Sequence, residues 1–75
     1  MWIEGRVRGF RFCLKRYSAP PKYGLSAGRV SKLMIWQESQ HGIRTIKARF
    51  ERGWETIPED EDSVKALESL MERYN

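Results

Sequence analysis

The chain has 75 residues, of which 40% are hydrophobic and 32% charged, and its formal net charge is +4. This length allows one small core and no deep cleft, since such a domain buries only about 60% of its unfolded surface. A single cysteine excludes an internal disulfide, and no apolar run is long enough for a membrane span or a signal peptide. We therefore expect one globular domain over residues 1–75, soluble and cytoplasmic, with no membrane partner.

The segment RVRGFRFCLKR, residues 6–16, changes the phase of its apolar alternation at Gly9. Apolar residues before this glycine are odd-numbered and those after it are even-numbered, so a straight strand would place the two sets on opposite faces. A two-residue turn at Arg8 and Gly9 would pair Ile3 with Leu14 and bring both sets to one face. A long strand with a bulge at Gly9 would do the same. The hairpin is the favoured interpretation, and the bulged strand remains open.

Two further strands are expected after a loop. Residues 18–28 are rich in Pro, Gly and Ser, which predicts the loop. Residues 29–37 and 43–54 have β character and flank the polar turn ESQHG. They predict a second hairpin.

Alternation along these strands predicts which side chains face the core. In the later strand Ile46 is expected inside and Lys47 outside, beside Arg49. The earlier strand is apolar in both phases, and an inward Leu33 leaves Trp36 outside. The expected core consists of Phe12, Leu33, Ile46, Phe50, Leu67 and Leu70.

The last segment changes to helical spacing. Its apolar residues recur at intervals of three and four, namely Val64, Leu67, Leu70, Met71 and Tyr74. They predict an amphipathic helix over about 60–74, with Asp60 as N-cap and further acids at the positive end of the helix dipole. The expected fold is α+β: a small antiparallel four-stranded meander of two hairpins, about residues 2–54, with this helix packed on one face.

Charge is divided unevenly along the chain. Residues 1–50 contain eleven Lys or Arg and two Glu, a net of +9, whereas residues 51–75 contain three Lys or Arg and eight acids, a net of −5. This predicts a basic sheet backed by an acidic helix and favours nucleic acid, duplex or single-stranded, as partner of the open sheet face. The expected nucleic-acid-binding residues are Arg6, Arg11, Lys15, Lys32, Trp36, Lys47 and Arg49.

Two other interpretations of the basic face stay open. Exposed strands use Lys and Arg for solubility and to block edge pairing. A protein-interaction module, either a homodimer or a binder of an acidic partner, would use Trp36 and Met34 as anchors.

No catalytic residue, metal ligand or cofactor is predicted. His41 has no second ligand at a metal-binding spacing, and Cys13 has neither a general base nor a pocket in the sequence pattern. The stretch GLSAGRVS departs from a phosphate-binding loop in its glycine spacing and in its last two residues. We therefore expect a binding module rather than an enzyme.

The elements WIEG, YGLSAGRVSKL, ERGW and the closing amphipathic helix resemble a family of short uncharacterised proteins, a domain of unknown function, from Gram-positive bacteria and their phages and mobile elements. The resemblance spans most of the chain. It implies the fold described above and a mobile-element setting, and it implies no activity.

Overall fold

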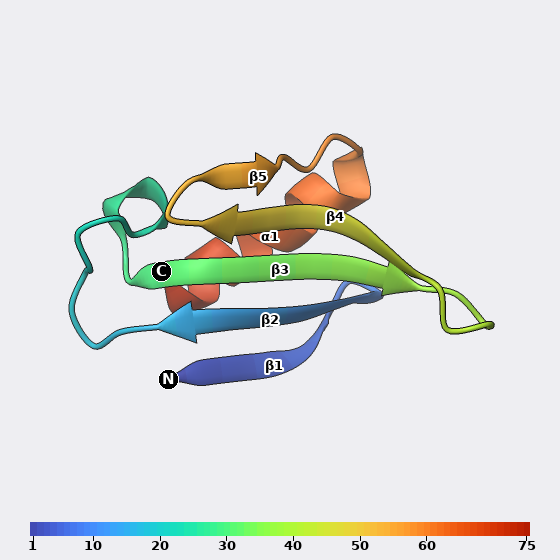
Figure 1. Ribbon diagram of the computed structural model, residues 1–75, viewed down its shortest axis with the longest axis horizontal. Helices are drawn as coiled ribbons and strands as arrows, with labels where there is room; N and C mark the ends of the chain where they lie inside the picture. Colours follow the sequence, from blue (N-terminus) through green and yellow to red (C-terminus); the bar gives the residue numbers. More distant parts are fainter.

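The computed structural model describes residues 1–75 and consists of one antiparallel sheet with a helix across one face (Figure 1). The elements are β1 (Trp2–Val7), β2 (Phe10–Arg16), the 3-10 helix η1 (Leu25–Ala27), β3 (Val30–Glu38), β4 (Arg44–Glu51), β5 (Trp54–Thr56) and α1 (Glu61–Tyr74). The strand order is β1-β2-β3-β4-β5, a simple meander. The α+β class and the C-terminal helix are confirmed. The expected number of four strands is wrong, because β5 adds a fifth.

The phase change at Gly9 is a hairpin turn. Ile3 faces Leu14 across β1 and β2, as the hairpin interpretation requires. Arg8 and Gly9 have φ angles of 48° and 84°, and a two-residue turn that continues the twist of its strands needs positive φ at both positions. The structure therefore excludes a single bulged strand.

The fifth strand follows a turn that resembles the first one in sequence. Arg52, Gly53 and Trp54 repeat the Arg-Gly-aromatic order of the first hairpin, and Arg52 also has a positive φ, of 60°. Trp54 pairs with Phe50, and their ring centroids lie 5.3 Å apart in an edge-on arrangement. This repeated tripeptide is the signal in the sequence from which β5 could have been predicted.

The core lies between the sheet and α1. Its buried residues are Phe10, Phe12, Leu14, Leu25, Val30, Leu33, Ile35, Ala48, Phe50, Ala66 and Leu70. Leu67 is partly buried against this cluster rather than inside it. The prediction for Ile46 is wrong, because this side chain is 37% exposed.

A register shift between β3 and β4 explains the exposed Ile46. Ile35 faces Ala48, but the next residue, Trp36, faces Ile46, so Lys47 has no partner. One extra residue in a strand reverses the alternation beyond it. Ile46 therefore lies with Trp36 on the face of the sheet away from α1, which we call the outer face.

The helix begins with the expected cap. Asp60 accepts a hydrogen bond from the Ser63 backbone N–H at 3.1 Å, and the Ser63 hydroxyl donates to Asp60 Oδ1 at 2.8 Å. These hydrogen bonds, with a smaller contribution from nearby Lys47, lower the pKa of Asp60. Of the helix residues, Ser63, Ala66 and Leu70 are buried. At 14 residues and with this charge, α1 lacks the length and apolar character needed to cross a membrane.

Candidate nucleic-acid interface

Cross-strand pairing brings the predicted cations together in rows on the outer face. Arg6 faces Arg11, and Lys15 faces Lys32. Like charges placed directly opposite each other destabilise a sheet. An anion bound over either pair would relieve this repulsion, so both pairs are candidate contacts for phosphate.

Carboxylates neutralise part of the outer face. The ion pairs are Arg11–Glu38 at 3.5 Å, Lys32–Glu51 at 3.2 Å, Arg49–Glu55 at 3.0 Å and Arg49–Glu51 at 4.0 Å. Glu51 and Glu55 belong to the acidic part of the sequence. Glu51 faces Lys32 across β3 and β4, and the turn into β5 brings Glu55 beside Arg49. The outer face is therefore mixed in charge rather than continuously basic.

Lys47 lies apart from the other predicted cations. Its ammonium is 3.8 Å from the carboxylate of Asp60, at the start of α1. This differs from the expected position beside Arg49, and the cause is the register shift that leaves Lys47 unpaired in β4. Lys47 therefore forms an ion pair with the N-cap residue of α1 instead of joining the cations of the outer face.

Trp36 lies on the outer face as expected, but its ring is covered. Only 7% of the residue is exposed, and the guanidinium of Arg44 lies 4.5 Å from the ring centroid. The indole Nε1 is buried without a hydrogen-bond partner. A base could stack on this ring only after Arg44 moved away.

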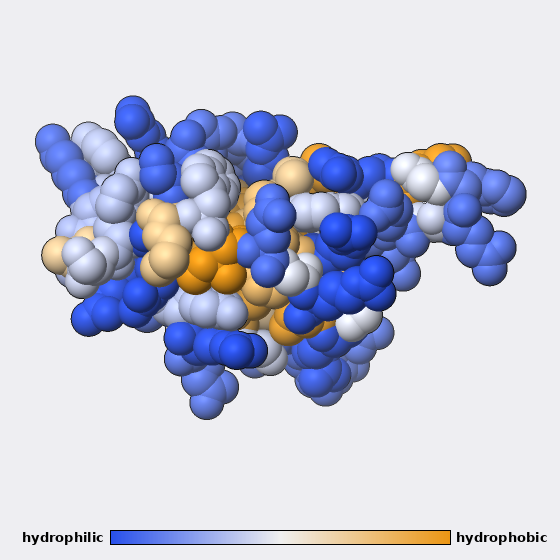
Figure 2. Space-filling view, turned by 90° about the horizontal axis from the view of Figure 1, so that it is seen from below, coloured by the Kyte–Doolittle hydropathy of each residue, from blue (hydrophilic) through white to orange (hydrophobic).

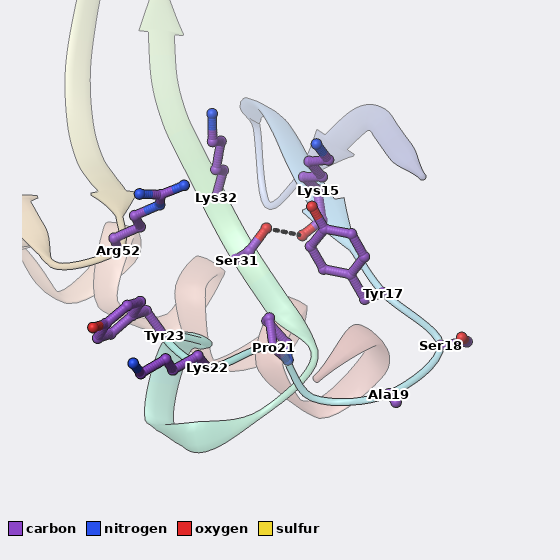
Figure 3. Close-up of a pocket in the computed structure, with 10 residues that line it drawn as sticks. All are labelled: Lys15, Tyr17, Ser18, Ala19, Pro21, Lys22, Tyr23, Ser31, Lys32 and Arg52. Carbon is purple, nitrogen blue, oxygen red and sulfur yellow. Dashed lines mark hydrogen bonds between the residues drawn. The ribbon is translucent and has the colours of Figure 1, made fainter.

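Four cations surround a pocket of about 600 Å³ (Figure 3), and one of them, Lys32, is also the ion-pair partner of Glu51. We call this cavity the basic pocket. Its lining residues are Lys15, Tyr17, Ser18, Ala19, Pro21, Lys22, Tyr23, Ser31, Lys32 and Arg52. Four of these ten are Lys or Arg, and none is Asp or Glu. The pocket is therefore suited to an anion.

Several parts of the chain contribute to the basic pocket. Figure 1 shows the β2–β3 loop and the β4–β5 turn at the same end of the sheet. The loop supplies Lys22 and Tyr23, and the turn supplies Arg52. A register shift between β2 and β3 leaves Ser31 unpaired, and its hydroxyl donates to the Lys15 carbonyl at 3.5 Å (Figure 3).

The loop that carries Tyr17 to Tyr23 is fixed to the rest of the fold. Leu25 is buried in the core, and the Arg16 Nε–H donates to the Tyr74 carbonyl at 2.7 Å. Gly24 approaches Gly28 so closely that a Cβ at Gly24 would collide with the Gly28 carbonyl. The backbone on both sides of residues 17–23 is thus held in place.

Two tyrosines stand on opposite sides of the basic pocket (Figure 3). Tyr17 is 40% exposed and Tyr23 is 54% exposed. Lys15 lies beside Tyr17, with its Nζ 5.4 Å from the ring centroid, and lowers the pKa of the Tyr17 hydroxyl; Ser31 and Lys32 act in the same direction. Lys15, Ser31 and Lys32 of the pocket lining thus all act on the Tyr17 hydroxyl.

The basic pocket is lined by no Cys, His, Asp or Glu. Burial raises the pKa of the Cys13 thiol, and the facing Glu4 raises it further, so the thiol is protonated at neutral pH. No three side chains of the His, Cys, Asp or Glu type lie close enough together to bind a metal ion.

Residues 1–75 match a protein family described as "Domain of unknown function (DUF7678)". The chain belongs to this family. No curated protein and no solved structure matches it. The DUF7678 match confirms the resemblance to an uncharacterised family.

Sequence reasoning identified only part of this site. Lys15 and Lys32 were predicted. Lys22 and Tyr23 were not, because residues 18–28 were assigned only to a loop, and Arg52 was not, because residues 43–54 were assigned to one strand. The available signal was the mixture of basic and aromatic residues in that loop, which is typical of surfaces that bind nucleic acid.

Proposed function

We propose that this protein is a non-enzymatic module that binds nucleic acid through the basic pocket and the adjoining outer face. The observation that carries the proposal is a pocket whose lining has four cations, two exposed tyrosines and no Asp or Glu; of the four cations, Lys32 is paired with Glu51 beside the pocket. Lys15 and Lys32 in its lining face each other across β2 and β3, and a phosphate would stabilise this like-charge pair.

Single strands fit this site better than a duplex. Lys and Arg at the pocket neutralise backbone phosphates, and exposed aromatic rings stack on bases. Bases in a duplex are already stacked on each other, so Tyr17 and Tyr23 gain most from an unpaired strand. Arg6 and Arg11 form a second like-charge pair farther along the outer face, where the backbone can continue. Such a module suits the mobile-element setting that the family resemblance implies.

The other predicted residues contribute less to this proposal. Arg49 contacts two carboxylates, and Lys47 contacts Asp60. Trp36 is covered by Arg44, so in this conformation neither a base nor a protein partner reaches its ring. The alternative interaction module with Trp36 and Met34 as anchors therefore requires a rearrangement that the nucleic-acid proposal does not need.

The test is binding of labelled single-stranded and duplex oligonucleotides over a range of salt concentrations. If the four pocket cations neutralise phosphates, the logarithm of the association constant should fall against log salt with a slope of about −2.8 for single strands. Replacing two of the cations, Lys22→Gln with Arg52→Gln, should flatten that slope by about 1.4.

A matched variant controls for the change in net charge. Lys65→Gln with Arg73→Gln removes one Lys and one Arg from α1, which lies on the other side of the sheet. This variant should bind nearly as well as the unmodified protein. The proposal is wrong if no oligonucleotide binds at low salt, or if both double variants weaken binding equally.

A further inference from the structure

β1 is an open edge of the sheet. It is the outermost strand, and the opposite edge strand, β5, has only three residues. Figure 2 views the molecule from the β1 side and shows apolar surface exposed between hydrophilic groups. Ile3 and Val7 of β1 are only partly buried against the core. An edge of this kind can add another strand.

The pairing with β2 determines which backbone groups of β1 are free. Met1 and Arg16 exchange two hydrogen bonds, Met1 N–H to Arg16 O at 2.9 Å and Arg16 N–H to Met1 O at 2.8 Å. Bonded and non-bonded pairs alternate along an antiparallel ladder. The odd-numbered residues of β1 therefore bond to β2. The even-numbered residues Trp2, Glu4 and Arg6 direct their N–H and C=O groups toward the free edge.

The charges on this edge are complementary to those of a second copy of the same strand. Glu4 and Arg6 flank Gly5 symmetrically, and neither forms an ion pair within the chain. An antiparallel copy of β1 with Gly5 opposite Gly5 places each Glu4 opposite an Arg6. These are also the residues whose backbone groups are free, so the ion pairs and the new backbone hydrogen bonds require the same register.

We propose that β1 pairs with the β1 strand of a second copy of this chain, antiparallel and centred on Gly5, to form a two-fold dimer with one continuous sheet. The same register places Ile3 opposite Val7 on the core side and covers their exposed parts. Such an interface is closed, because both copies use the same surface.

Competing arrangements are less favourable. A shift by two residues in either direction places Glu4 opposite Glu4 or Arg6 opposite Arg6, and like charges directly opposite are destabilising. Pairing of β1 with β5 of another copy would leave two edges free and propagate without closing. The short length of β5 also limits that contact. Charged edge residues normally block pairing, but here they select one register of self-pairing.

This proposal shares Arg6 with the outer-face part of the nucleic-acid proposal, but it does not depend on the basic pocket. No residue of β1 lines the basic pocket. The dimer is therefore tested by oligomeric state in the absence of nucleic acid, by sedimentation equilibrium from micromolar to millimolar protein. We expect a reversible equilibrium between one and two chains.

The decisive variants are Glu4→Arg and Arg6→Glu. Each one alone places like charges opposite each other at two symmetric positions, which should raise the dimer dissociation constant about tenfold or more. A mixture of the two variant proteins should form a heterodimer, because each acid then faces a base again. Recovery in the mixture also shows that both variants are folded.

Glu72→Arg is the matched control, because it changes the net charge by the same amount as Glu4→Arg at an exposed position of α1. It should leave the dimer dissociation constant unchanged. The proposal is overturned if the unmodified protein stays monomeric at millimolar concentration. It is also overturned if a dimer forms but neither substitution raises its dissociation constant. A mixture of the two variants that remains monomeric, while circular dichroism shows both proteins folded, would overturn it as well.

Discussion

Asn75 and Val30, which are 45 residues apart, are joined by a hydrogen bond of 3.1 Å from the Val30 backbone N–H to the Asn75 side-chain oxygen. The Asn75 side-chain N–H donates to the Leu25 carbonyl at 2.9 Å. One amide thus ties the end of the chain following α1 to the loop that forms the basic pocket. Gly28 permits this contact, because a Cβ there would collide with the Asn75 amide.

Replacing Asn75 should loosen the loop. Asn75→Ala leaves the buried Val30 N–H without a partner and removes one of the two donors to the Leu25 carbonyl, the other being the Gly28 N–H, which should lower the free energy of unfolding by about 1 to 3 kcal/mol. Asn75→Asp is the informative comparison, because it keeps the acceptor for Val30 and loses the donor for Leu25. Urea unfolding measures the free energy of unfolding of the unmodified protein and of the two variants. Equal stability of all three would show that the Asn75 side chain does not contact Val30 or Leu25.

Two of the six residues that the sequence places in the core, Leu70 and Ile46, should behave differently. Leu70 is buried under the sheet, so Leu70→Ala should cost about 2 to 5 kcal/mol of unfolding free energy. Ile46→Ala should cost much less, because the register shift places Ile46 on the outer face. Denaturant titration of both variants checks this, and a large loss at Ile46 would contradict the observed register.

The tyrosines, and not Trp36, should support stacking of bases. Tyr23→Ala should remove about 1 to 3 kcal/mol from the binding free energy of a single strand and leave the salt slope nearly unchanged, because no cation is lost. Trp36→Phe should retain most of the affinity, since the ring is covered by Arg44. Fluorescence anisotropy titrations compare the two variants. The reverse order of effects would indicate that Arg44 moves aside to expose Trp36.

Binding should weaken at alkaline pH through Tyr17. The nearby Lys15 lowers the pKa of this phenol below its ordinary value of 10.0, so the hydroxyl loses its proton at a lower pH than a free tyrosine does. The phenolate adds negative charge to the pocket and opposes phosphate, so affinity should fall as the pH rises toward that range. Oligonucleotide titrations from neutral to alkaline pH measure the fall.

Tyr17→Phe provides the control for this pH dependence. The variant has no phenol at that position, so its affinity should decline later as the pH rises. Tyr23→Phe should keep the decline of the unmodified protein. Identical profiles for all three proteins would show that Tyr17 does not face the bound phosphate.

The sequence alone determined the features that depend on neighbouring residues. The turn at Arg8 and Gly9 was predictable because positive φ and the phase of alternation are short-range properties. The helix and its cap at Asp60 were predictable because a stripe at helical spacing and a capping side chain lie within a few residues of each other.

Only the tertiary structure decided where the outer-face charges meet. Unpaired residues in three strand pairs, Ser31, Lys47 and Glu55, shift the register of their strands. A shift of one residue changes the face that later side chains occupy, and it becomes visible only when the partner strand is known. For this reason the sequence placed Ile46 in the core, and it could not show that Glu55 reaches Arg49.

The basic pocket also depends on the tertiary structure. Lys15, Lys22 and Arg52 are up to 37 residues apart in the sequence, and they meet because the β2–β3 loop and the β4–β5 turn reach the same end of the sheet. Composition predicted an excess of positive charge, because a sum of charges does not depend on conformation. The location of that charge required long-range contacts, which no local pattern in the sequence encodes.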